Sequence, residues 1–349
     1  MPIRSKSFVE TYQEDQSLFR TIWIKFWWII FIISILAFPF VVGRYMLYTI
    51  NLVAIYAIGA IGLNILTGYT GQISVGHAAF IAIGAYSTTI LGETFLPFYV
   101  IIPLSGVIAT FIGLLVGIPC LRLRGLYLAM ATMSFGIIIQ YVLFHWEGLT
   151  HGAFGMAAPS ITFLGFKVES GKEFYFFIMI VVFLLGFAAK NMMRMKIGRA
   201  FIAIRDREIA ADVIGVNLTR YKVMAFGISS FYAGISGSLF AYYTTHVNPE
   251  YFTLFLSIEY LAMIIVGGLG TILGSILGAM FIGLVPEWLG ILFGFLAKTL
   301  HLGGLAFMQQ FKIITYGVLI ILFLIFESGG LFAIWQRIKT GFKSWPFTY

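Results

Sequence analysis

Long apolar runs follow one another along almost the whole chain. A helix needs about 20 mainly apolar residues to cross the hydrocarbon core of a membrane, and this spacing predicts about ten spans. Their expected ranges are 21–42, 46–66, 77–92, 98–119, 126–146, 174–190, 223–243, 254–267, 272–296 and 312–326. The pattern predicts an all-α, polytopic membrane protein. A transmembrane domain over 21–326 would lie between cytoplasmic tails at 1–20 and 327–349.

Two uncharged, glycine-rich interruptions stand out, at 68–77 and 266–274. Backbone that leaves a helix at membrane depth has to be buried in protein or line an aqueous cavity. Paired interruptions in the two halves of a chain are typical of transporters with inverted repeats, although a pair of tight helix–helix turns is the alternative. The candidate pathway residues in these segments are Gly68, Gly71, Gln72, Ser74, His77, Gly268 and Gly270.

Composition and charge support the membrane class. Hydrophobic residues make up 60% of the chain and charged residues 10%, against about 25% charged residues in soluble domains. The net charge of +8 comes from cations in loops and tails, which orientation and anionic membrane lipid explain without nucleic-acid binding.

The positive-inside rule predicts the orientation. The cytoplasmic side would hold both termini, the loop 191–221, and the basic residues Arg122, Arg124, Arg337, Lys339 and Lys343. The loop 147–173 would lie outside. We therefore expect a multi-pass protein of the inner (plasma) membrane.

The loop 191–221 is the main candidate for binding a cytoplasmic partner. The stretch from Lys190 to Lys222 holds eight of the 22 Lys and Arg residues. We predict a helix over 204–214 that ends at Gly215. Its apolar stripe would be formed by Phe201, Ile204, Ile209, Val213 and Ile214. Such a helix can lie on the membrane surface, but its mixed charges favour a protein partner.

Catalytic chemistry is not evident. The chain has no G-x-x-x-x-G-K-[ST] motif, its five histidines are too scattered for a metal site, and Cys120 is interpreted as a packing residue. We predict no catalytic, cofactor or metal site, and hence no enzyme.

Small residues spaced by four at Ser105, Ala109, Gly113 and Gly117 predict close helix packing. Glu259 is an acid within a span. A structural hydrogen bond to 266–274 or to a helix end is the favoured interpretation, and a role in transport is the alternative.

Several blocks resemble the branched-chain amino acid permease family. They are GLNILTGYTGQISVGHAAFIAIGAY (62–86), RGLYLAMATMSFG (124–136), EIAADVIG (208–215), EYLAMIIVGGLGTILGSILGA (259–279) and a W-P-F-x-Y tail at 345–349. EIAADVIG is similar to the E-A-A…G loop of ABC importer permeases. The resemblance implies a type II-like importer for leucine, isoleucine or valine. It also implies a sister permease, two cytoplasmic ATPases that bind ATP and Mg, and a periplasmic or surface-tethered binding protein. The ATPase-coupling residues would be Arg205, Asp206, Glu208, Ala210, Ala211 and Gly215.

Other functions remain as alternatives. Within the family, urea and short amides are alternative substrates. A stand-alone secondary carrier is less favoured, because it usually needs more intramembrane ionisable residues than this chain offers. A membrane-embedded enzyme would need a cluster of catalytic groups at a membrane face.

Overall fold

The computed structural model describes residues 22–94, 96–120, 123, 125–159, 162–163, 166–167, 171–300, 314–315, 317–318, 321, 325 and 329–344. The chain divides into two compact units, residues 1–47 and 48–349. In the first unit, α2 (Ile22–Val41) is an apolar helix that contains Pro39. Apart from the first residues of α3, the features that follow lie in the second unit.

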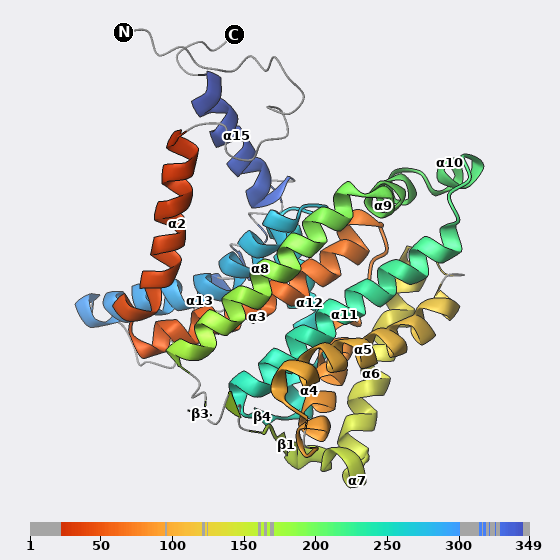
Figure 1. Ribbon diagram of the computed structural model, residues 1–349, viewed down its shortest axis with the longest axis horizontal. Helices are drawn as coiled ribbons and strands as arrows, with labels where there is room; N and C mark the ends of the chain where they lie inside the picture. Colours follow the sequence, from red (N-terminus) through yellow and green to blue (C-terminus); the bar gives the residue numbers. More distant parts are fainter. Residues whose placement is uncertain are drawn as a thin grey trace. The chain divides into compact units, whose positions relative to one another are not determined.

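The described chain is almost entirely helical (Figure 1). The longer helices are α3 (Arg44–Asn64), α4 (His77–Gly92), α5 (Phe98–Cys120), α6 (Leu126–His145), α8 (Lys172–Arg194), α9 (Lys196–Asp206), α11 (Leu218–Thr244), α12 (Leu254–Gly267), α13 (Ile272–Leu300) and α15 (Gly330–Ser344). Short turns are the π-helix η1 (Ile65–Tyr69), α7 (Glu147–Thr150), η2 (Gly152–Phe154), α10 (Glu208–Val213) and η3 (Pro249–Phe252).

Four two-residue strands form two antiparallel pairs. β1 (Met156–Ala157) pairs with β4 (His246–Val247), with Met156 opposite Val247. β2 (Thr162–Phe163) pairs with β3 (Phe166–Lys167).

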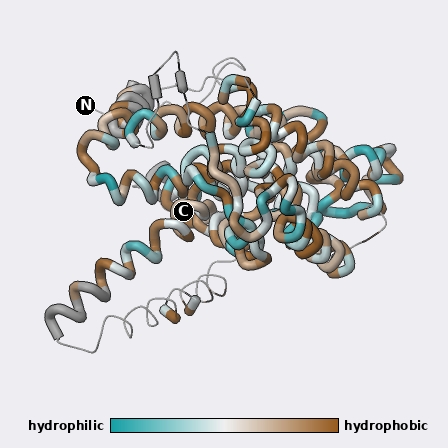
Figure 2. The backbone as a smooth tube through the Cα atoms, turned by 90° about the horizontal axis from the view of Figure 1, so that it is seen from below, coloured by the Kyte–Doolittle hydropathy of each residue, from teal (hydrophilic) through white to brown (hydrophobic). Residues whose placement is uncertain are grey.

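Among the described residues, six helices are long and apolar enough to cross a membrane. They are Arg44–Tyr69, Phe98–Cys120, Leu126–His145, Lys172–Arg194, Leu218–Thr244 and Ile272–Leu292, and α4 and α12 are shorter apolar helices. Hydrophobic residues run along most of these helices (Figure 2). The protein is therefore a polytopic, helical membrane protein. Most of the predicted span at 312–326 lies outside the described residues, as do Arg122, Arg124 and the 345–349 tail.

Small residues bring α5 and α11 close together. A Cβ placed on Gly234 would lie 2.6 Å from the Cβ of Ala109, and one on Gly113 would lie 2.1 Å from Oγ of Ser230. Such short spacings leave no room for a larger side chain, so the predicted packing role of the small residues in α5 is confirmed.

Candidate functional site

The two glycine-rich interruptions lie against each other, and the side chain of Asn64 joins them. Asn64 ends α3 and is buried. Its Nδ2 donates to the carbonyl oxygen of Thr271 at 2.8 Å and to Oγ of Ser275 at 2.7 Å. Its Oδ1 accepts from the backbone N–H of Gly270 at 2.9 Å. The amide thus supplies an acceptor for the N–H of Gly270 in the broken segment and adds a second hydrogen bond to the carbonyl oxygen of Thr271, which also accepts from the N–H of Ser275.

Glycine is required where these segments touch. A Cβ on Gly68 would lie 1.8 Å from Oδ1 of Asn64 and 2.4 Å from the backbone nitrogen of Gly270. Gly270 and Gly268 also have positive φ angles, +74° and +123°, which residues with a Cβ rarely adopt. The glycines predicted at 68, 268 and 270 thus allow the two broken segments to pack closely.

Arg205, at the end of α9, contacts both broken segments. Its Nη1 donates to the carbonyl oxygen of Gly68 at 2.9 Å. A Cβ on Gly270 would lie only 2.6 Å from the same Nη1, and one on Gly71 would lie 3.2 Å from Cγ of Arg205. The guanidinium also pairs with Asp206, with Nε to Oδ1 at 3.2 Å. The loop 191–221 is therefore connected directly to the interrupted spans.

The helix predicted over 204–214 is wrong in one respect, because the structure divides it. Arg207 has an extended backbone (φ −154°, ψ 101°) between α9 and α10. This break allows Phe201 and Ile204 of α9 to be buried, while Ile209, Val213 and Ile214 are exposed (75%, 82% and 74%). The five apolar residues therefore do not form one stripe, because those of α9 are buried and those of α10 are exposed.

The other predicted coupling residues differ in accessibility. Ala210 is exposed, whereas Ala211 is 1% exposed and packs within its own chain. Glu208 forms an ion pair with Nζ of Lys222, a buried residue of α11. Gly215 is exposed with a φ of +90° and has open space around its Cβ position. We define the docking surface as the exposed residues Ile209, Ala210, Val213 and Ile214.

The polar residues of the first broken segment are buried. Nε2 of His77 donates to the carbonyl oxygen of Gly59 at 2.9 Å, and its ring packs edge-on against Tyr260 at 5.3 Å. Nδ1 of His77, Nε2 of Gln72 and Oγ of Ser74 have no hydrogen-bond partner among the described residues. His77 thus helps to join α4 to α3 and α12.

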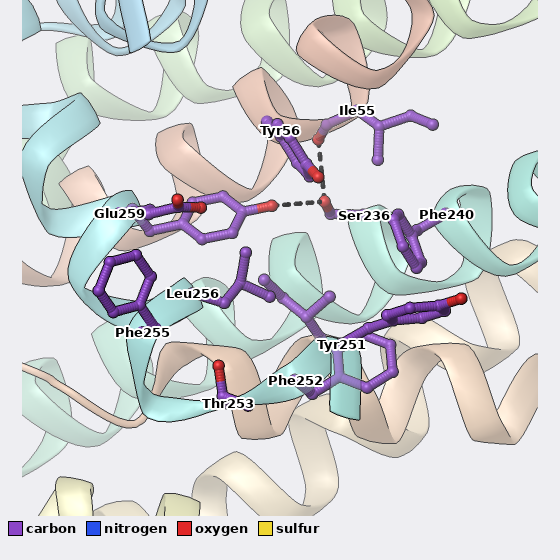
Figure 3. Close-up of a pocket in the computed structure, with 12 residues that line it drawn as sticks. Ile55, Tyr56, Ser236, Phe240, Tyr251, Phe252, Thr253, Phe255, Leu256 and Glu259 are labelled. Carbon is purple, nitrogen blue, oxygen red and sulfur yellow. Dashed lines mark hydrogen bonds between the residues drawn. The ribbon is translucent and has the colours of Figure 1, made fainter. Parts of the chain in front are cut away.

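Glu259 lines a cavity of ≈ 230 Å³ between α3, α4, α11 and α12. The lining residues are Ile55, Tyr56, Ile81, Ser236, Phe240, Tyr251, Phe252, Thr253, Phe255, Leu256, Glu259 and Tyr260. Glu259, Tyr56 and Ser236 lie toward one side of it, and Tyr251, Phe252 and Thr253 toward the other (Figure 3). Oγ of Ser236 donates to the carbonyl oxygen of Ile55 at 2.9 Å. No hydrogen bond from Glu259 to residues 266–274 is present in the described chain, so the favoured structural role of its carboxylate is not supported.

Sequence reasoning missed Asn64 and Lys222. Asn64 is an amide within an apolar run, directly before the first interruption, and that position was the available signal. Lys222 lies at the start of an apolar span, where its pairing with Glu208 required the tertiary structure.

Two glycine-interrupted segments that pack against each other in a helical membrane protein are typical of transport proteins. The sequence model of the family described as "Branched-chain amino acid transport system / permease component" matches residues 45–326. The chain belongs to this family.

Three relatives illustrate the similarity. The high-affinity branched-chain amino acid transport system permease protein LivM of Salmonella typhimurium is 34% identical over 271 residues, 70% of this chain and 64% of that protein. LivM of Escherichia coli is 32% identical over 283 residues, 74% of this chain and 67% of that protein. The permease protein LivH of Salmonella typhimurium is 24% identical over 255 residues, 67% of this chain and 81% of LivH. The chain thus spans about two thirds of the length of the LivM proteins. No solved structure gives a significant match.

Proposed function

We propose that this chain is the membrane-spanning permease subunit of an ATP-driven importer for leucine, isoleucine and valine. It would form half of the translocation pathway, beside a sister permease. Two cytoplasmic ATPases would supply the energy, and a binding protein outside the membrane would deliver the substrate. The family, and the branched-chain amino acid transport systems to which LivM and LivH belong, support the substrate class.

The observation that carries the proposal is a continuous set of contacts from the docking surface to the broken segments. α10 presents exposed apolar side chains, a feature that helix-in-groove docking requires. α10 is held to α11 by the ion pair between Glu208 and Lys222. The adjoining α9 reaches Gly68 through Arg205. Movement of an ATPase bound to α10 would therefore be transmitted to the interrupted spans as a rigid-body shift.

We also propose a type II-like fold of about ten spans with inverted repeats, inserted in the inner membrane with both termini cytoplasmic. The short helices α4 and α12 support the proposed inverted repeats, because each adjoins one of the two interruptions. Short, interrupted segments in the two halves of a chain are typical of repeat-built transporters. In this arrangement Arg337 and Lys339 of α15 lie on the cytoplasmic side.

The test of energy coupling is uptake of radiolabelled leucine by proteoliposomes that contain the complete complex and loaded binding protein. We expect uptake only when ATP is supplied, and no effect of a protonophore. Uptake that persists without ATP and collapses with the protonophore would identify a secondary carrier instead. Binding measurements on the purified binding protein, with leucine, urea and acetamide, separate the alternative substrates.

The test of the docking surface is co-purification of the ATPases with variant permeases. We expect the double variant Ile209→Asp, Val213→Asp to lose the ATPases, because two charges would have to be buried in the partner's groove. Phe154→Asp is the matched control, since Phe154 is 88% exposed in η2, near the end of α11 that is far from the docking surface. Retention of the ATPases by the double variant would refute the assignment.

A further inference from the structure

The cavity that contains Glu259 has one charged group and no cation among its described lining residues. Its walls are mainly aliphatic and aromatic, with hydroxyl groups from Tyr56, Ser236, Tyr251, Thr253 and Tyr260. Glu259 makes no hydrogen bond or ion pair within the described chain, although it is half-buried. Acidic side chains within membrane spans almost always pair or face an aqueous cavity, and they mark substrate or ion pathways. The missing partner of this carboxylate is therefore expected to be a cation that enters the cavity.

The cavity lies far from the docking surface. α11 starts at Leu218, directly after the loop that carries α10, and ends at Thr244. Ser236 is eighteen residues along this helix, which corresponds to about 27 Å at 1.5 Å per residue. Beside α3 and α4, the walls come from η3 and the first half of α12, which follow β4 at the far end of α11. A substrate that arrives from the side opposite the ATPases would meet this cavity first.

The wall chemistry selects the kind of cation. Ca²⁺ takes about six to eight oxygen ligands, and a single carboxylate among hydroxyls and rings does not provide them. A primary ammonium needs one carboxylate and a few further acceptors, and it is also attracted to aromatic faces such as those of Tyr56 and Phe255. An aliphatic body attached to that ammonium would contact Ile55, Ile81 and Leu256.

We propose that this cavity binds the ammonium group of an aliphatic amine at Glu259, and that during import it receives the α-ammonium of a branched-chain amino acid. The second part rests on the proposed function. Within the transport cycle the cavity is an entry site for substrate released by the binding protein. Glu259 is its specificity-determining residue, because an analogue without the ammonium leaves the carboxylate unpaired.

The experiment measures binding of radiolabelled 3-methylbutylamine, which is leucine without its carboxylate, to the purified permease complex without binding protein. We expect saturable binding that is at least about tenfold weaker in Glu259→Gln, because a hydrogen bond between two charged groups is lost. Glu259→Asp keeps the charge and should retain part of the affinity. Glu250→Gln is the matched control, because it removes the same charge from η3, where Glu250 is exposed and does not line the cavity.

Competition identifies the group that is recognised. Unlabelled leucine should displace the amine, whereas 4-methylpentanoate, which has a carboxylate and no ammonium, should compete at least about tenfold less well. No saturable amine binding, equal binding by Glu259→Gln, or equal competition by 4-methylpentanoate would each overturn the proposal. Failure of the proposed function is seen separately, as leucine uptake by the unaltered complex that does not need ATP.

Discussion

At the scale of single residues, Asn64 organises the region where the two broken segments meet. Its side chain accepts from Gly270 and donates to Thr271 and Ser275. Buried polar groups are costly unless they are hydrogen-bonded, and here each half of the amide has a partner. The residue therefore stabilises backbone that would otherwise be unsatisfied in the membrane.

Asn64→Leu should destabilise the protein by about 1–3 kcal/mol, because it leaves the partly buried N–H of Gly270 without its acceptor. The measurement is the thermal denaturation of the purified protein in detergent. Asn51→Leu is the control, since Asn51 is equally buried but makes fewer hydrogen bonds among the described residues. Its Nδ2 donates to the hydroxyl of Tyr243 at 3.2 Å, and its Oδ1 has no hydrogen-bond partner there. We expect a smaller effect for the control, and equal melting temperatures for the two variants would contradict the role of Asn64.

At the scale of elements, the break at Arg207 divides the loop 191–221 into two short helices with different contacts. α9 buries Phe201 and Ile204 and holds the broken segments through Arg205, whereas α10 projects its apolar residues outward. The ion pair of Glu208 with Lys222 holds the first residue of α10 against α11. In the proposed coupling, α10 would contact the ATPase and α9 would pass its movement to the broken segments.

Arg205→Met should uncouple transport while leaving the complex assembled, because it removes the hydrogen bond to Gly68 without changing the docking surface. Allosteric coupling energies usually correspond to about 5- to 150-fold effects, so we expect leucine imported per ATP hydrolysed to fall on the order of tenfold. The measurement combines uptake and ATP hydrolysis in proteoliposomes. Arg199→Met removes a charge from an exposed position of the same helix and should behave like the unaltered protein. A normal ratio in Arg205→Met would exclude this contact from the coupling path.

At the scale of the whole permease domain, the docking surface and the β1–β4 pair lie at opposite ends of α11, whose 27 residues span about 40 Å. The basic loop lies at one end of α11 and Glu147, at the start of α7, lies near the other, which agrees with one orientation in the membrane (Figure 1). Phe154 and Val213 are exposed positions at these two ends. They allow the orientation to be measured.

Single cysteines at these positions should be labelled from opposite sides. In a Cys120→Ser background, we expect Phe154→Cys to react with a membrane-impermeant maleimide in right-side-out vesicles. Val213→Cys should react only in inverted ones. Cys120 is the chain's one cysteine and is buried, so its replacement leaves no competing thiol. Labelling of both cysteines from the same side would refute the proposed topology.

The lengths of the apolar runs in the sequence were sufficient to predict the helical class of the protein and the positions of most helices. The predicted runs 77–92 and 254–267 coincide with α4 and α12, and 98–119 differs from α5 by one residue. These agreements arise because a segment that crosses lipid must make all of its backbone hydrogen bonds within its own helix. Such segments are long apolar runs, which can be recognised from the sequence alone. Both glycine-rich interruptions could be located for the same reason, since they are gaps in those runs.

Only the tertiary structure decided how the polar residues are used. Asn64, Arg205 and Gly270 are far apart in the chain, and their hydrogen bonds depend on how the two broken segments and α9 pack. The predicted helix over 204–214 failed because burial of Ile204 and exposure of Ile209 are set by contacts with other helices, which periodicity does not contain. Likewise, Glu259 could be recognised as an intramembrane acid, but its cavity is formed by four helices that meet only in the folded protein.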